Sequence, residues 1–530
     1  MRPILRNKLY LYLTEFFAGM SVMAVELGAS RLLAPYFSSS QIVWTIIIGT
    51  IMIAMALGNV YGGRKADKDP NPDKLYRRIL IAAVWIGLIP VLGKYIILGI
   101  SALMIFSVNA NYLIWAAFAA CMVIFVFPLF LLGTVTPSLA KYTMENLEDN
   151  ARVVGSLGAA NTIGSIIGTF VPTFVTIPAV GTAITFLIFA GILLALALVY
   201  FFSGKGRRGG AIAALALFLG SCVFGHQSNF AFWKTDLRYE GESVYNYLQV
   251  EETERSVILS TNVLFGVQSI KMKDEGLTGM YYDYALAAPL MAGAGEKEQL
   301  DVLILGMGTG TYGRQCLRYF DGVTVEGVEI DEKITALARE HFDLPAEIRV
   351  STYDGRAFLA AVDSKYDVIM VDAYQDITIP FQMASVEFFT LVRDHLKEGG
   401  VMVVNMNMRG EEDSINQYLA DTISVVFSQV YTVDVTGDTN RELFASNTPD
   451  LLSSLERGIA LCQDPELRGM MTRVSGRLVP YEAGNRIMTD DRAPVELLSM
   501  QVMDQLIDRE VAYYRAIYEE QGIQGLIDGL

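Results

Sequence analysis

The pattern of apolar and polar positions in this chain changes near residue 230. Before that point, long apolar segments follow one another, and most of them are long enough to cross a bilayer as helices. These segments lie near 9–33, 42–63, 79–105, 111–136, 154–177, 181–203 and 210–226. We therefore predict a multi-span α-helical membrane domain over residues 1–228, with about seven apolar spans and the lipid bilayer as its partner.

Charge follows the same division. Residues 1–230 carry 16 Lys and Arg and 8 Asp and Glu, out of 41 and 57 in the whole chain, so the remainder is strongly acidic. Basic residues gather at the N-terminus and in the loops 64–78 and 204–209, whereas the loops near 37–41, 106–110 and 178–181 carry none. The positive-inside rule then predicts a multi-pass protein of the cell membrane with a cytoplasmic N-terminus.

Two features indicate that the apolar half is more than an anchor. Glu26 and Arg31 fall within or at the end of the first span, where ionisable residues are costly and often functional. The small residues around Asn161 favour close helix packing. Gly-Gly-Arg-Lys-Ala-Asp at 62–67 resembles the cytoplasmic loop signature of major-facilitator transporters, so transport stays open as an alternative.

Beyond Trp233 the apolar positions alternate with polar ones. Short strands over 243–250, 256–260 and 262–268, and a helix over 281–292, predict a small antiparallel β-sheet with a linking helix in residues 229–295. Strands over 301–305, 323–329, 347–351, 367–372 and 400–406 then alternate with helical segments. This alternation predicts a soluble α/β Rossmann-like domain over 296–530, built on a doubly wound, mostly parallel sheet.

The first of these parallel strands ends in a glycine-rich turn. Gly306, Gly308 and Gly310 occupy alternate positions before a helical segment, and such glycines allow a ligand to approach the main chain closely. The next strand ends at Glu329, and a carboxylate at that place can hold both hydroxyls of a ribose. The combination predicts a site for a nucleoside cofactor.

Acidic residues also end the following strands. Asp354, followed by Gly355, suits a hydrogen bond to an adenine amino group, and Asp372 and Asp376 can hold a cationic amine or remove its proton. A single such acid is often only a helix cap. Four strand ends with matching chemistry favour a binding site, and the acidity of this half disfavours nucleic acid as a partner.

Metal binding and disulfides are not indicated. The four cysteines are dispersed without a CxxC motif, and the chain has three histidines, so we expect no metal site. Towards the C-terminus, residues 495–515 have an amphipathic pattern that could pack on the sheet or on a second subunit, which leaves a homo-oligomer open.

These residues resemble those of the spermidine synthase family, the aminopropyltransferases related to class I methyltransferases. The matching segments are Glu242-Ser-Val-Tyr245, Gly266-Val-Gln268, Tyr281-Tyr-Asp283-Tyr with Pro289-Leu290, Leu303–Gly310, Val328–Asp331 and Tyr353-Asp354-Gly355. In addition, Thr489–Glu496 resembles a closing motif of a membrane-fused branch of the family, which extends the likeness over nearly the whole chain.

The resemblance implies a cofactor and an amine substrate. Glu329 would bind the ribose and Asp354 the adenine of decarboxylated S-adenosylmethionine, while Tyr281 and Gln268 would line the site of a polyamine. The loop from Asp372 to Asp376 would supply the base, with Asp376 as the expected catalytic acid–base group. The remaining residues that we place on the substrate side are Asp283, Thr309, Gln375, Asp490 and Asp491.

Two positions depart from the family pattern. Thr309 stands where the family has the Asp that receives the aminopropyl ammonium, and Gln375 stands where it has the catalytic Asp, with Asp376 one residue later. A membrane-bound transferase of aminopropyl or related alkyl groups remains our first interpretation. The alternatives are a methyltransferase that uses S-adenosylmethionine itself, or a polyamine transport or sensing protein with a non-catalytic nucleoside-binding domain.

The side of the membrane on which the acidic half lies is left open by the pattern. Seven spans from a cytoplasmic N-terminus would place it outside, whereas a short segment 210–226 that does not cross would keep it in the cytoplasm. We favour the cytoplasm because the expected cofactor is found there.

Overall fold

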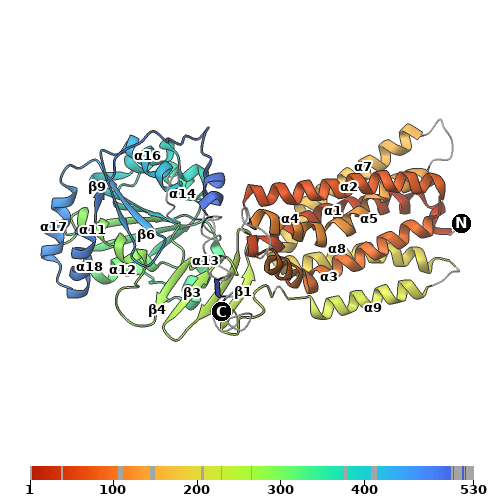
Figure 1. Cartoon of the computed structure of the whole chain (residues 1–530), viewed down its shortest axis with the longest axis horizontal. Coiled ribbons are helices and arrows are strands. Elements are labelled where there is room, and N and C mark those ends of the chain that lie inside the picture. Colours follow the sequence, from red (N-terminus) through yellow and green to blue (C-terminus); the bar gives the residue numbers. More distant parts are fainter. Residues whose placement is uncertain are drawn as a thin grey trace. The chain divides into compact units, whose positions relative to one another are not determined.

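The structure is a computed structural model that describes residues 3–37, 40–105, 112–143, 150–204, 208–227, 229–263, 266–374, 379–407 and 415–502, with a few single positions beyond. The chain forms two compact units (Figure 1). The helical unit comprises Met1–Thr235, Glu240–Tyr247 and Asn262–Leu264, and the α/β unit comprises Asp236–Tyr239, Leu248–Thr261 and Phe265–Leu530. The expected division into 1–228, 229–295 and 296–530 stays a prediction.

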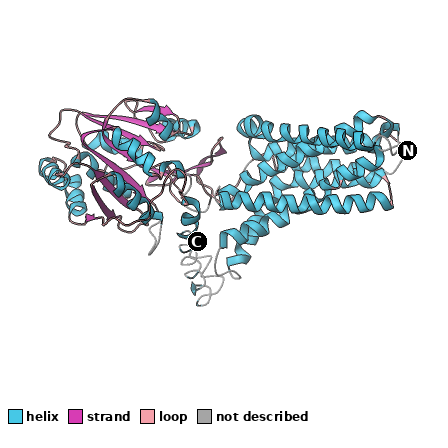
Figure 2. Ribbon diagram, turned by 90° about the horizontal axis from the view of Figure 1, so that it is seen from above, coloured by secondary structure: helices cyan, strands magenta, loops and turns pink. Residues whose placement is uncertain are grey.

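The helical unit consists almost entirely of helices, drawn in cyan in Figure 2. They are η1 (Pro3–Arg6), α1 (Lys8–Phe37), α2 (Gln41–Lys68), α3 (Pro72–Ile105), α4 (Tyr112–Ile124), α5 (Val126–Gly133), α6 (Val135–Thr143), α7 (Asn150–Val171), the π-helical turn η3 (Pro172–Thr176), α8 (Ile177–Phe202) and α9 (Gly209–Phe224). Each of the expected apolar segments is helical. Between η3 and the main part of α8, Gly181 adopts φ 79°, which breaks the helix.

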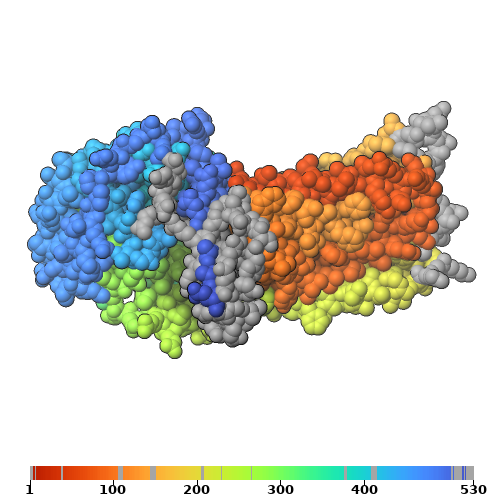
Figure 3. All heavy atoms as spheres, viewed as in Figure 1, coloured from red at the N-terminus to blue at the C-terminus, as the bar shows by residue number. Residues whose placement is uncertain are grey.

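Several of these helices have the length and composition of membrane spans. Among the described residues, 4 helices are long and apolar enough to cross a bilayer, or up to 5 if the bent pair Tyr112–Ile124 and Val126–Thr143 counts as one span. The stretch Ala151–Phe202 counts as one of the 4, and Gly209–Phe224 is shorter. Large apolar side chains are exposed on this unit, whose surface is red to yellow in Figure 3; examples are Met52, Ile53, Leu57, Ile163, Phe170, Phe174, Leu217 and Phe224. A soluble surface rarely carries so many.

Helices α1 and α7 pack closely, as the small residues of α7 predict. A Cβ added at Gly164 would lie 2.0 Å from the carbonyl oxygen of Phe16, so only glycine fits there. Next to this contact the carboxylate of Glu15 is buried and accepts hydrogen bonds from Asn161 Nδ2 (2.8 Å) and Thr136 Oγ1 (2.5 Å). The sequence interpretation did not single out Glu15.

The two ionisable residues that it did single out lie elsewhere on α1. Arg31 donates hydrogen bonds to the carbonyl oxygens of Ser243 (3.2 Å) and Val244. Glu26 is half-buried. Arg31 therefore anchors the segment Glu240–Tyr247 to the helices within the same unit.

A small antiparallel sheet follows in the order β1 (Leu237–Glu242), β2 (Tyr247–Glu252), β3 (Ser256–Ser260) and β4 (Ser269–Met272). The strand expected over 262–268 is wrong in its described part. The N–H of Val263 donates to the carbonyl oxygen of Pro35 instead of a neighbouring strand, and Gly266 adopts φ 82°. The next strand, β4, starts only at Ser269.

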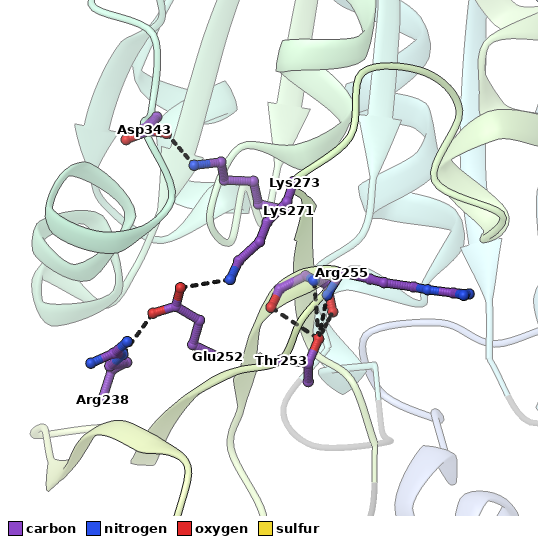
Figure 4. A network of polar contacts seen from close by, with 8 residues as sticks. Arg238, Glu252, Thr253, Arg255, Lys271, Lys273 and Asp343 are labelled. Carbon is purple, nitrogen blue, oxygen red and sulfur yellow. Dashed lines mark hydrogen bonds and ion pairs between the residues drawn. The ribbon is translucent and has the colours of Figure 1, made fainter.

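Charged side chains join the strands of this sheet (Figure 4). Glu252 accepts from Arg238 Nε (2.6 Å) and Lys273 Nζ (2.7 Å), and Lys271 pairs with Asp343 beyond α13 (Glu332–His341). The apolar face of α13 also packs on β2 and β3, so the small sheet is attached to the large one.

The large sheet has eight strands in the order β12-β10-β11-β9-β8-β5-β6-β7. Their bounds are β5 (Leu300–Leu305), β6 (Val323–Glu329), β7 (Arg349–Thr352), β8 (Tyr366–Val371), β9 (Leu396–Met406), β10 (Gln429–Asp434), β11 (Arg441–Ser446) and β12 (Val479–Pro480). Strands β5 to β9 pair in parallel, whereas β11 runs antiparallel to β9 and β10. The doubly wound, mostly parallel sheet that the sequence predicts is confirmed.

Helices cover both faces of this sheet (Figure 1). One face carries α10 (Tyr281–Ala285), α11 (Ala287–Met291), α12 (Thr311–Tyr319), α17 (Leu451–Leu461) and α18 (Pro465–Ser475). The other carries α14 (Gly355–Ala361), the short helix η4 (Phe381–Met383), α15 (Val386–Asp394) and α16 (Ile415–Val426). The expected helix over 281–292 is present as α10 and α11. In such a fold, ligands bind at the carboxyl edge of the parallel strands.

Candidate active site

The glycine turn connects β5 to α12 and lies against the loop that follows β8. Gly306, Gly308 and Gly310 all have positive φ, at 83°, 56° and 82°. A Cβ at Gly306 would lie 2.5 Å from the carbonyl oxygen of Asp372 and 2.6 Å from Cα of Ala373. Glycine is required here because the two loops touch through their backbones.

Thr309 lies inside this turn and is fully buried. Its hydroxyl donates to Ser269 Oγ (2.8 Å), and its N–H donates to the same oxygen (3.1 Å). Ser269 begins β4, so the turn is held by the small sheet as well as by its own strand. The hydroxyl of Thr309 is thus used within the protein, where a carboxylate would stand in the family pattern.

Glu329 ends β6 beside the turn. Its carboxylate accepts from the N–H of Gly308 (2.9 Å) and from the N–H of Asp331 (3.0 Å). Burial raises the pKa of Glu329 to about 7, although these backbone donors favour the ionised form. The backbone of the glycine turn therefore fixes the orientation of this carboxylate at the carboxyl edge of the sheet.

Asp354 and Gly355 follow β7 and start α14. Asp354 Oδ1 accepts from the N–H of Ala357 (2.8 Å), so the residue caps its helix and retains a second oxygen for a ligand. The neighbouring Arg356 binds both oxygens of Asp490, at 2.7 Å and 2.6 Å. Asp490 thereby joins the segment after α18 to this edge of the sheet. Asp491 is exposed.

The hydrogen bond with Arg356 also keeps the pKa of Asp490 below its usual value. Ser385 donates to the same carboxylate (2.6 Å). With three donors on its oxygens, Asp490 holds the protein together at this point rather than presenting a free carboxylate to an amine.

Asp372 follows β8 and is the central carboxylate of the edge. Its Oδ2 accepts from Tyr281 Oη (2.6 Å) and its Oδ1 accepts from Asn405 Nδ2 (2.8 Å). Burial raises the pKa of Asp372 to about 7, and the two hydrogen bonds partly oppose that shift. A buried acid with a pKa near neutrality is suited to bind an ammonium group and to exchange a proton with it.

The other residues expected on the substrate side lie at different distances from Asp372. Gln268 Nε2 donates to the carbonyl oxygen of Tyr374 (3.5 Å), which places it beside the loop after β8. Asp283 is buried and accepts from Thr278 and from the N–H of Gly279 (2.6 Å), so it fixes the turn before α10. Gln375 and Asp376 lie outside the described residues.

Two groups of this edge were missed from the sequence. Asn405 is the penultimate residue of β9 and donates to Asp372, yet an amide near a strand end carries no signal of its own. Glu442 is the second residue of β11 and is fully buried. Because β11 runs antiparallel, its start lies at the edge where the parallel strands end, and only the strand order shows this.

The opposite edge of the sheet makes a useful contrast. There Asp367 is buried and paired with Lys297 (2.6 Å) and Lys397 (2.8 Å). At the carboxyl edge, no Lys or Arg of the described residues pairs with Glu329, Asp372 or Glu442. Buried acids usually have a cationic partner, so this edge fits a cationic ligand.

Fold and site together define a Rossmann-like α/β domain with buried acidic residues at the carboxyl edge of its parallel strands. A profile described as Spermine/spermidine synthase domain matches residues 285–439. The chain is 50% identical over 348 residues to the "Probable polyamine aminopropyl transferase" of Bifidobacterium longum, an alignment that covers 62% of this chain and 77% of that protein. The chain belongs to the spermine/spermidine synthase family and is an enzyme of the polyamine aminopropyltransferase kind.

Other proteins are similar to parts of this chain. The "Polyamine aminopropyltransferase" of Oceanobacillus iheyensis is 27% identical over 383 residues, which cover 66% of this chain and 70% of that protein. Among solved structures, a probable spermidine synthase from Corynebacterium glutamicum shares 20% identity with a TM-score of 0.33, and covers 47% of this chain and 97% of its own. Spermidine synthase from Thermotoga maritima shares 19% identity with a TM-score of 0.34, over 46% and 88%.

Proposed function

We propose that this enzyme transfers an aminopropyl group from decarboxylated S-adenosylmethionine to a polyamine, in a protein whose helical unit lies in the cell membrane. One observation carries the proposal. Asp372 is a buried carboxylate without a cationic partner among the described residues, and it lies in backbone contact with the glycine turn through Gly306. An amine held there would be next to a nucleoside held by the turn.

The residues of the turn fit the donor. Glu329 would accept hydrogen bonds from the ribose hydroxyls, Asp354 would contact the adenine amino group, and the backbone of Gly306, Gly308 and Gly310 would leave room for the nucleoside. Its sulfonium supplies an aminopropyl carbon that an amine can attack. With Thr309 in place of an acid, Asp372 is the described carboxylate that would meet the positive charge of the reacting amine.

The chain contributes orientation, exclusion of water and removal of a proton. The acceptor nitrogen forms a bond to the aminopropyl carbon, the C–S bond breaks with its electron pair left on the sulfur of methylthioadenosine, and the proton from nitrogen passes to a carboxylate. Tyr281 and Asn405 fix the carboxylate of Asp372 by hydrogen bonds, and this carboxylate orients the acceptor. Asp376, four residues further along the same loop, remains our predicted base.

The membrane assignment is part of the same proposal. The apolar helices of the N-terminal unit and the positive-inside pattern support a multi-pass protein with a cytoplasmic N-terminus. We further propose that the α/β unit faces the cytoplasm, where the donor is made. Labelling of a cysteine introduced at Gly437 in intact cells and in inverted vesicles distinguishes the two sides.

Mass spectrometry of the amine product tests the reaction type. Purified full-length protein is incubated with decarboxylated S-adenosylmethionine or S-adenosylmethionine and with a panel of diamines and polyamines. We expect an amine that carries one additional aminopropyl group. A methylated amine would instead establish the methyltransferase alternative, and binding of polyamine without either product would establish a sensing or transport role.

Tyr281→Phe tests how the hydroxyl of Tyr281 tunes Asp372. The wild-type pKa of about 7 predicts that kcat/KM rises with pH through neutrality as Asp372 ionises. The hydrogen bond from Tyr281 favours the ionised form, so its loss should move this acidic limb to higher pH and lower activity by about tenfold at pH 6. The pH profile of kcat/KM measures the effect, and Tyr319→Phe, which loses a half-buried hydroxyl that donates to Glu466 at the far end of α12 from the glycine turn, is the control. An unmoved limb in Tyr281→Phe would mean that Asp372 does not control it.

A further inference from the structure

The buried carboxyl group of Glu442 has no role in the function proposed so far. It is 0% exposed, and neither of its oxygens has a hydrogen-bond partner among the residues that the structure describes. Leaving a buried carboxyl without partners costs several kcal/mol, about as much as many whole interactions in a fold. A polar group that is buried without a partner requires an explanation, and a bound ligand is one.

The strand register places Glu442 beside the amine site. Glu442 pairs with Asn405 across β11 and β9, and Asn405 donates to Asp372. Side chains of directly opposed residues in an antiparallel pair lie on the same face, with Cβ atoms about 5 Å apart. The side chain of Asn405 therefore lies between Glu442 and Asp372 on this face of the sheet.

The alternation along β11 gives the direction of the side chain. Leu443 and Ala445 pack in the core under α14, α15 and α16, whereas Phe444 packs in the core under α10, α11 and α12. Glu442 lies on the same face as Phe444, because side chains two apart in a strand point the same way. This is also the face from which Tyr281 reaches Asp372.

Two tyrosine hydroxyls in the surroundings of Glu442 are already used. Burial raises the pKa of both Tyr312 and Tyr374, and the charge of Glu442 adds a smaller share to each shift. Tyr312 Oη donates to the carbonyl oxygen of Ala285 (3.1 Å), and Tyr374 Oη donates to that of Asn405 (2.5 Å). A tyrosine has a single hydroxyl proton, so neither can satisfy Glu442.

Glu442 and Asp372 are ends of one site rather than two. Burial, with the charge of Asp372 as a smaller cause, raises the pKa of Glu442 well above its usual value. Strand β9 alone separates β8 from β11, so the two backbones are about 10 Å apart. Two buried acids at this separation can be bridged by a molecule that carries an ammonium group at each end.

The position along the sheet decides which ammonium Glu442 would take. The glycine turn follows β5, on the far side of β8 from β11. The donor's aminopropyl group must lie near that turn, and Asp372 is next to it. We infer that Glu442 binds the second, non-attacking ammonium group of a diamine or polyamine acceptor, and so selects acceptors with two positive charges. This inference rests on the proposed aminopropyl transfer.

The test compares 1,4-diaminobutane with 1-aminobutane, which lacks the second ammonium group. Binding to the full-length protein is measured by calorimetry in the presence of methylthioadenosine, and KM is measured by turnover. We expect Glu442→Gln to weaken 1,4-diaminobutane by about 10- to 100-fold, the usual value of a charge-assisted contact, and to leave 1-aminobutane within about twofold. Glu398→Gln, an exposed residue near the start of β9, should change neither amine.

Two outcomes would overturn the inference. Equal weakening of both amines would mean that Glu442 acts through Asp372 or through the fold, and unchanged binding of the diamine would mean that it makes no contact. Because calorimetry needs no turnover, it separates this inference from the proposed function. If the wild-type protein forms no aminopropylated product but prefers the diamine in a manner that depends on Glu442, the proposed function is refuted and this inference stands.

Glu442→Asp provides a second variant in case the amide does not fold. It retains the charge and withdraws it by one methylene group, so the preference for a diamine should persist and shift from 1,4-diaminobutane towards 1,5-diaminopentane. An unshifted preference in Glu442→Asp would contradict direct contact with the acceptor.

Discussion

Asp372→Asn is expected to lower kcat/KM for the amine acceptor by about 10²- to 10⁴-fold, the range for loss of a positioned carboxylate. Asn cannot carry the negative charge that holds an ammonium group, although it can still accept from Tyr281. The donor site at Gly308 and Glu329 is unaffected. Initial rates at pH 8 with a fixed donor concentration measure the loss, and calorimetry with methylthioadenosine should show unchanged nucleoside binding.

The stability of the same variant shows whether the loss is chemical. The pKa of Asp372 is raised from 3.8 to about 7, so the folded state binds this proton more tightly than the unfolded state. The contribution of the protonated Asp372 to the free energy of unfolding is complete below pH 4. It is lost as the pH rises through 7, at a cost of about 4 kcal/mol at most. Asp372→Asn should therefore melt at a higher temperature than wild type at pH 8 and near the wild-type temperature at or below pH 4.

A matched acid away from the site is the control. Asp394 is exposed at the end of α15 and pairs only with its neighbour Arg393 (2.8 Å) in the part of the chain that the structure describes. Asp394→Asn should retain wild-type kcat/KM. An Asp372→Asn protein that is folded and as active as Asp394→Asn would refute the role of Asp372.

Gly306→Ala is expected to have the second largest effect, because its Cβ would lie 2.5 Å from the carbonyl oxygen of Asp372. The two loops must separate to relieve this contact, and displacement of a reacting group by about 1 Å can cost 10²-fold in rate. We therefore expect kcat/KM to fall by at least about 10²-fold and the melting temperature to fall as well.

Gly399→Ala separates this contact from backbone strain. Gly399 has φ 76°, close to the 83° of Gly306, but a Cβ there would meet nothing within 4 Å. Alanine should cost about 1–2 kcal/mol of left-handed strain at either position. If the two variants lose the same activity and stability, the backbone contact between the glycine turn and the loop after β8 has no part in catalysis.

Local pattern was enough to place the residues that we propose for the donor at the carboxyl edge of the sheet. The apolar strands before Gly306 and Glu329 are parallel and buried, so their carboxyl ends could be aligned without the structure, and the glycines required by positive φ are visible in the sequence. The same reasoning placed Asp354 and Asp372 at the edge. These residues depend only on the order of strand, turn and helix.

The acceptor side depends on contacts between segments that are far apart in the chain. Glu442 and Asp372 are 70 positions apart, and only the antiparallel insertion of β11 beside β9 brings them to one edge. Asn405 belongs to the site because it donates a hydrogen bond to Asp372. The strand expected over 262–268 failed for the same reason, since Val263 finds its hydrogen-bond partner in Pro35.

The departures from the family pattern have a physical counterpart in this arrangement. Thr309 is buried and bonded to Ser269, so positive charge near the donor must be balanced elsewhere. Asp372 and Glu442 provide two buried carboxyl groups on the acceptor side. Their location favours an enzyme that recognises its acceptor by charge and length.

Initial rates of methylthioadenosine release, with decarboxylated S-adenosylmethionine and with S-adenosylmethionine as donors, are the most direct test of the proposed aminopropyl transfer. The purified full-length protein is supplied with one polyamine at saturation, and reactions without amine give the background. We expect amine-dependent release that is at least about 100-fold faster from the decarboxylated donor, together with one aminopropylated amine per methylthioadenosine. Release that does not depend on the amine, or turnover only with S-adenosylmethionine, would contradict it.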